Sequence, residues 1–76
     1  MKQMTRITLN PEVMGGKPCI RGMRVTVGTV VGLVASGHTL NQILQVYPYL
    51  EEADIYEALA YAAWWAEEIE VPLTLA

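Results

Sequence analysis

The sequence predicts a mainly α-helical fold in which a short N-terminal β-ribbon precedes three helices. Glycine and proline are interspersed with short apolar runs in residues 1–25, a pattern that favours strands joined by tight turns. Residues 26–69 instead carry apolar side chains at three- and four-residue spacing, the period of an amphipathic helix. We therefore expect one domain of 76 residues, with a basic ribbon (1–25), a three-helix bundle (26–69) and an extended tail (70–76).

The ribbon is predicted from two extended segments and the turns between them. Arg6–Leu9 alternates polar and apolar residues, and Pro18–Val25 is the second extended piece, paired with the first. The turn residues are Gly15, Gly16, Pro18 and Gly22. Glycine reaches positive φ freely and proline fixes φ near about −65°, so these residues predict tight reversals. Because two strands alone are marginal in water, we expect the ribbon to rest on a helix or on a second copy of itself.

Cap signals place the first two helices. Thr26 is a good N-cap for a helix over about 27–36, although the valine-rich sequence of this segment leaves a strand as the alternative. Thr39 and Gln42 form a capping-box pattern for a helix over about 40–47. The third helix is predicted over about 51–69. A short second helix, a tight linker and a long third helix have helix-turn-helix proportions.

Apolar residues of the third helix share one stripe that is expected to face the core. They are Ile55, Ala58, Leu59, Ala62, Ala66 and Ile69. On a helical wheel Trp64 lies nearly opposite this stripe, beside Glu57 and Glu68, so we predict that it belongs to an interface together with Leu73 and Leu75 of the apolar tail. Trp65, at the flank of the stripe, is expected to be a core tryptophan. The alternative is that the tail folds back over Trp64.

Charge is distributed unevenly along the chain. All five Lys and Arg residues lie in residues 1–24 and give that part a net charge of +4, whereas residues 25–76 contain seven acidic residues and neither Lys nor Arg. The cations are Lys2, Arg6, Lys17, Arg21 and Arg24. This asymmetry predicts an N-terminal surface suited to anions and a C-terminal surface suited to basic partners.

Several classes of protein are disfavoured by composition. A single cysteine, Cys19, and a single histidine, His38, supply neither an internal disulfide nor a recognisable metal-ligand set, and nothing in the sequence pairs them as a catalytic dyad. The apolar run Val25–Ala35 is far shorter than the roughly 20 residues of a membrane helix, and the N-terminus has no secretory signal pattern. We expect a cytoplasmic protein that is not an enzyme and has no cofactor, metal or membrane contact.

Several short motifs follow one another in a distinctive order. They are Asn10-Pro11-Glu12-Val13, Gly15-Gly16-Lys17-Pro18, Ile20-Arg21-Gly22, Arg24-Val25, Gly37-His38-Thr39, Ile43-Leu44, Tyr47-Pro48 and Ala58-Leu59-Ala60-Tyr61-Ala62. This order resembles domain-of-unknown-function family 433, a family of small bacterial antitoxin-like proteins. The resemblance implies a homeodomain-like, helix-turn-helix bundle and a role as the VapB-type antitoxin of a PIN-like nuclease. Members of this family tend to have Thr or Ser where this chain has Glu51.

Function is therefore expected to be binding rather than catalysis. The main hypothesis is an antitoxin that neutralises a PIN-like nuclease and binds its own operator DNA; the alternatives are a stand-alone DNA-binding regulator and a dimeric interaction module that binds no nucleic acid. Lys17, Arg21 and Arg24 are the candidate contacts to DNA or toxin, because Glu52 and Glu57 at the start of the third helix would repel phosphate. Since 53% of this small chain is hydrophobic, we also expect a homodimer or larger assembly.

Overall fold

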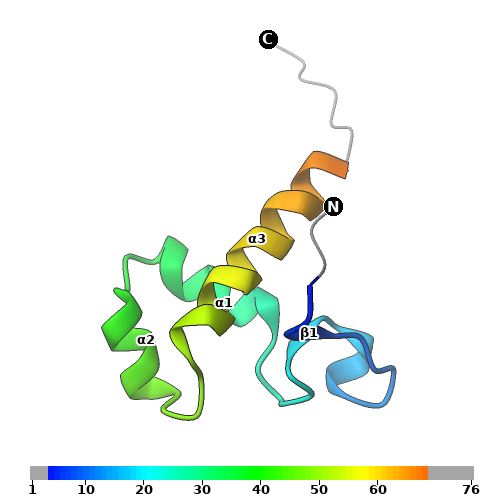
Figure 1. Cartoon of the computed structure of the whole chain (residues 1–76), viewed down its shortest axis with the longest axis horizontal. Helices are drawn as coiled ribbons and strands as arrows, with labels where there is room; N and C mark the ends of the chain where they lie inside the picture. Colours follow the sequence, from blue (N-terminus) through cyan, green and yellow to red (C-terminus); the bar gives the residue numbers. More distant parts are fainter. Residues whose placement is uncertain (1–3, 69–76) are drawn as a thin grey trace, which may run out of the picture.

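The computed structural model describes residues 4–68 and contains a two-stranded ribbon followed by three helices (Figure 1). The elements are β1 (Ile7–Thr8), the 3-10 turn η1 (Met14–Gly16), β2 (Cys19–Ile20), α1 (Val27–Ala35), α2 (Leu40–Val46) and α3 (Glu52–Glu68). Figure 1 shows α2 and the ribbon on opposite sides of the start of α3, with the last turns of α3 running out beyond both. This arrangement confirms the predicted fold class.

The ribbon pairs as predicted, but its second strand is much shorter. β1 and β2 are antiparallel, with Ile7 opposite Ile20. The prediction of one extended piece over Pro18–Val25 is wrong, because Arg21 (φ 44°) and Gly22 (φ 73°) form a turn directly after β2. Two successive residues at positive φ are typical of a type I′ turn, the turn that best matches the twist of paired strands.

Both predicted N-caps are present. Thr26 Oγ1 accepts a hydrogen bond from the Thr29 N–H (3.0 Å), so the valine-rich segment is a helix and not a strand. Thr39 and Gln42 form the reciprocal capping box: Thr39 Oγ1 accepts from the Gln42 N–H (3.1 Å), and Gln42 Oε1 accepts from the Thr39 N–H (2.8 Å). In the described part of the chain, no helix combines the length and the apolar character needed to cross a bilayer.

One hydrophobic core joins the ribbon to all three helices. Its buried members are Ile20, Val25, Val27, Val30, Ile43, Leu50, Ile55 and Ala58. Within residues 52–67 of α3, Ala58 is the last buried residue. Trp65 lies two turns further along on the same side of the helix, and it is 53% exposed. The prediction that Trp65 is a core tryptophan is therefore wrong.

Candidate functional site

Asp54, in the first turn of α3, is fully buried and accepts four hydrogen bonds. Its Oδ1 accepts from Arg6 Nη1 (2.9 Å) and Arg21 Nε (3.0 Å). Its Oδ2 accepts from Arg21 Nη2 (2.8 Å) and from the backbone N–H of Glu51 (2.8 Å). Arg21 therefore binds the carboxylate in the bidentate geometry that makes arginine–carboxylate pairs strong. Because both oxygens are paired twice, the buried charge is fully compensated.

The same charged groups connect the ribbon to the start of α3. Arg21 Nη2 also donates to the carbonyl oxygen of Tyr49 in the α2–α3 linker (3.1 Å). Arg6 Nη1 donates to Glu51 Oε1 (2.6 Å), and the Arg6 backbone N–H donates to the carboxylate of Glu57. We call Arg6, Arg21, Glu51, Asp54 and Glu57 the Asp54 cluster. This cluster fixes the positions of three segments relative to one another: the segment at Arg6, the turn at Arg21 and the start of α3.

Glu51 has a different role from the threonine or serine expected at this position. A Thr or Ser there would cap the helix with its own hydroxyl. In this structure the Glu51 side chain instead binds Arg6, while the Asp54 carboxylate reaches back to the Glu51 N–H, which is half of a capping box. The Glu51 side chain and the Glu51 N–H are thus both paired within the Asp54 cluster.

The pKa of Asp54 reflects two opposing effects. Burial of the carboxyl acts to raise its pKa, but the hydrogen bonds from Arg21, from the Glu51 N–H and from Arg6 outweigh burial and hold the pKa below its ordinary value of 3.8. Asp54 is therefore ionised at neutral pH, and the cluster is an ion-pair network under physiological conditions.

The three predicted cationic site residues do not form one common surface. Arg21 belongs to the Asp54 cluster, whereas Lys17 and Arg24 are exposed and form no ion pair within residues 4–68. No local sequence pattern indicates this difference, because Asp54 lies 33 positions after Arg21. Only Lys17 and Arg24 remain suited to bind an external anion.

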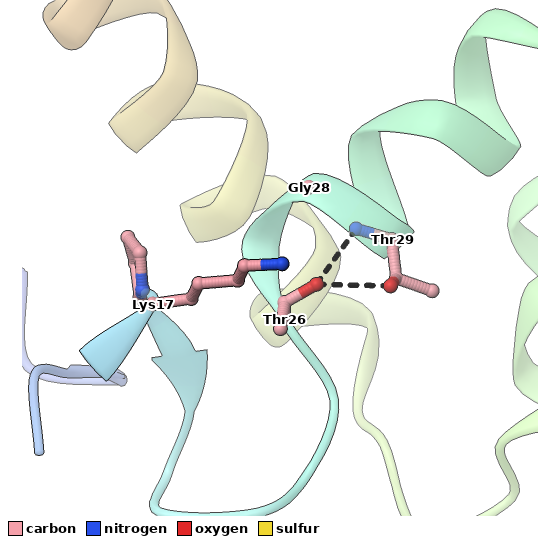
Figure 2. Close-up of a pocket in the computed structure, with 5 residues that line it drawn as sticks. Lys17, Thr26, Gly28 and Thr29 are labelled. Atoms are coloured by element: carbon pink, nitrogen blue, oxygen red, sulfur yellow. Dashed lines mark hydrogen bonds between the residues drawn. The ribbon is translucent and has the colours of Figure 1, made fainter. Parts of the chain in front are cut away.

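Lys17 lies beside the N-terminus of α1, at a shallow hollow of about 490 Å³ (Figure 2). The hollow is lined by Lys17, Pro18, Thr26, Gly28 and Thr29. Figure 2 shows the Lys17 amine lying close to Thr26 at the first turn of the helix. An ammonium group and the positive end of a helix dipole both attract anions. Within the described residues, this hollow combines the two features that suit a phosphate group.

The turn residues predicted from the sequence lie on either side of β2. Gly15 and Gly16 have φ values of 68° and 84° in η1, and Gly22 occupies the turn after β2. Positive φ is costly for residues with a side chain, so glycine permits the chain reversals on either side of β2. Pro18 itself lines the hollow. The Pro18 carbonyl oxygen also accepts a hydrogen bond from the Val27 N–H (2.9 Å), which holds this segment beside the start of α1.

A second candidate surface is the aromatic end of α3, formed by Tyr61, Trp64 and Trp65. The ring centroids of Tyr61 and Trp64 are 6.0 Å apart, as are those of Trp64 and Trp65. Trp64 and Tyr61 are half-buried, whereas Trp65 is exposed together with the neighbouring Glu67. The wheel argument pointed to this helix end, but the more exposed indole belongs to Trp65 rather than Trp64.

The other residues of the predicted interface have different positions. Glu57 is half-buried and accepts the Arg6 N–H, so it belongs to the Asp54 cluster. Glu68 is the last residue of α3, and Leu73 and Leu75 lie outside the described residues. Cys19 is buried, with its Sγ 3.2 Å from the carbonyl oxygen of Lys17, while His38 Nδ1 lies 3.1 Å from that of Leu33. The Cys19 thiol and the His38 ring thus contact two different backbone carbonyl groups.

The fold and these surfaces define a small three-helix protein with an N-terminal β-ribbon. The chain belongs to a family of proteins of unknown function, DUF433, whose family model matches residues 7–62. It is 39% identical over 56 residues to an uncharacterized protein, y4eO, of Sinorhizobium fredii. That similarity covers 74% of this chain and 25% of the relative, so the chain corresponds to about a quarter of that protein. No solved structure matches the chain.

Proposed function

We propose that this protein is a binding protein of the antitoxin type, which docks on a PIN-like nuclease and neutralises it. The observation that carries the proposal is the aromatic end of α3, where Trp65 is 53% exposed beside Trp64 and Tyr61. Large aromatic side chains that extend beyond a domain's own core are typical anchors of protein–protein contacts.

Charge indicates what kind of partner this surface would accept. Residues 25–76 contain seven acidic residues and no Lys or Arg, and Glu67, two positions after Trp65, is exposed. A nuclease needs a basic surface to bind its RNA substrate, and an acidic, aromatic helix end is electrostatically complementary to such a surface. The proposed mechanism of neutralisation is therefore coverage of the nuclease's substrate-binding surface.

The Trp65→Ala variant tests this proposal. We expect a neighbouring reading frame to encode a PIN-like protein, and we expect the wild type, when produced together with it, to co-purify with it and to inhibit its RNase activity. Loss of one anchor tryptophan typically reduces the binding free energy by about 2 kcal/mol. Trp65→Ala should therefore raise the dissociation constant about 30-fold, as measured by titration calorimetry.

Tyr56→Ala is the matched control for this experiment. Tyr56 is also on α3 and is 54% exposed, but it precedes the aromatic end of the helix by more than a turn. The Tyr56→Ala variant should bind the nuclease with the same affinity as the wild type. Equal binding by Trp65→Ala and the wild type would rule out the aromatic end of α3 as the docking surface.

Nucleic-acid binding is a second candidate function, supported by the hollow at the N-terminus of α1. Lys17 and Arg24 should supply the phosphate contacts, since Arg6 and Arg21 are committed to Asp54. Replacing both Lys17 and Arg24 with glutamine is therefore expected to weaken retardation of operator DNA and to lower the salt dependence of binding by about one ion per lost contact.

Two further measurements identify the surface that binds DNA. Glu52→Gln removes an exposed acidic residue at the start of α3 and should leave DNA retardation unchanged or strengthen it. Weaker binding by Glu52→Gln would mean that α3 reads the bases, as in an ordinary helix-turn-helix protein. Absence of retardation by the wild type at low salt would leave the interaction-module alternative, in which the protein binds no nucleic acid.

A further inference from the structure

We infer that, in the isolated protein, the ribbon lobe of a second copy of this chain covers the aromatic end of α3. The ribbon lobe consists of the exposed residues Leu9, Met14, Lys17 and Arg24. The inference concerns self-association and does not depend on the proposed nuclease partner.

Only part of the chain's positive charge is used within one copy. Arg6 and Arg21 both bind Asp54, whereas Lys17 and Arg24 are exposed and have no ion pair within residues 4–68. The same lobe exposes two apolar side chains, Leu9 (66%) and Met14 (39%). The exposed residues of the ribbon lobe therefore include both cations and apolar side chains.

The aromatic end of α3 has the complementary properties. Trp65 offers an exposed indole, and indole faces are the best aromatic partners for Lys and Arg cations. Glu67 adds an exposed negative charge one turn from Trp64. Each component of the ribbon lobe thus has a matching component on this helix end.

Pairing of two α3 helices would be electrostatically worse. The last turn of α3 contains Glu67 and Glu68 and no basic residue, so two copies of this helix end would bring like charges together. The ribbon lobe, by contrast, carries the exposed cations Lys17 and Arg24. Charge complementarity therefore favours contact between the ribbon lobe and α3 over contact between two α3 helices.

A chain's own ribbon lobe is badly placed to cover its own helix end. The ribbon is fastened to the first turn of α3 through Asp54, and Trp65 lies 11 residues later, about 16 Å further along the helix axis. Figure 1 shows the ribbon beside the start of α3 and the helix end far from it. A contact between these two surfaces therefore requires two different copies.

Two copies related by a two-fold axis can exchange these contacts reciprocally. Each ribbon lobe would cover the α3 end of the other copy, so the assembly closes as a dimer and does not grow as a filament. A stable interface buries about 1,200–2,000 Å² in total, and the two equivalent contacts together would bury this area.

Sedimentation equilibrium of the full chain tests the inference. We expect the wild type to form a dimer of the 8.4 kDa chain at micromolar concentration, with a dissociation constant that rises with salt. Trp65→Ala, and separately the double variant Lys17→Glu with Arg24→Glu, should each raise that constant at least about ten-fold with helicity unchanged. Tyr56→Ala is the control and should dimerise like the wild type.

A mixing experiment distinguishes this arrangement from other dimers. Trp65→Ala retains an intact ribbon lobe, and the double-glutamate variant retains an intact aromatic end, so an equimolar mixture can form one of the two contacts. We expect the mixture to associate more strongly than either variant alone. Unchanged dimerisation of the double-glutamate variant would show that other surfaces pair, and a wild type that sediments only as a monomer would equally overturn the inference.

Discussion

Replacing Asp54 with alanine is expected to lower the free energy of unfolding by about 3 kcal/mol, the cost typical of breaking a buried ion pair. The substitution removes the acceptor of four hydrogen bonds, which come from Arg6, Arg21 and the Glu51 N–H. For a domain of this size, that change corresponds to a fall in melting temperature of about 12–24 °C. Thermal unfolding followed by circular dichroism measures it.

Glu52→Ala provides the control, because Glu52 is in the same first turn of α3 but is exposed. It should change the free energy of unfolding by less than about 0.5 kcal/mol. A similar melting temperature for Asp54→Ala and Glu52→Ala would show that the Asp54 cluster does not stabilise the fold.

The dependence of the free energy of unfolding on pH provides an independent check on the charge of Asp54. Because folding lowers the pKa of Asp54, its ionisation contributes stability that is fully present above the ordinary pKa of 3.8 and is lost as pH falls through the folded-state value. The stability difference between wild type and Asp54→Asn, measured by urea unfolding, should therefore be largest near neutral pH and shrink below pH 3.8. A difference independent of pH would contradict the assignment of the charge to Asp54.

Arg21→Gln is expected to have the second-largest effect on stability, whereas Arg24→Gln should have almost none. The two arginines are three positions apart in the same basic segment, but only Arg21 is bound to the buried Asp54 carboxylate and to the Tyr49 carbonyl. Its loss leaves a buried charge only partly compensated. We expect the melting temperature to fall by about half as much as for Asp54→Ala, or more.

The same pair of variants separates stability from binding. Arg24→Gln should melt like the wild type and yet weaken any contact with nucleic acid or with a second copy. If Arg21→Gln were as stable as Arg24→Gln, the bidentate pair with Asp54 would have no structural role, and Arg21 would return to the group of candidate binding residues.

Local sequence determined most of the secondary structure of this protein. Thr26, Thr39 and Gln42 supply hydrogen bonds to backbone groups within three residues, so their capping roles follow from the sequence alone. Glycine at positive φ likewise depends only on the backbone at that position, as at Gly15 and Gly16. The turn at Gly15 and Gly16 and the two helices that follow Thr26 and Thr39 were predictable for this reason.

Tertiary structure alone decided which charged and aromatic residues are available for binding. Arg21 and Arg24 belong to the same basic segment of the sequence. Only the packing of α3 against the ribbon brings Asp54 to Arg21. Trp65 has the helical phase of a core residue, but exposure also depends on how far along α3 the packed elements extend. Periodicity gives the direction of a side chain around its helix, whereas contacts between distant segments determine whether anything covers it.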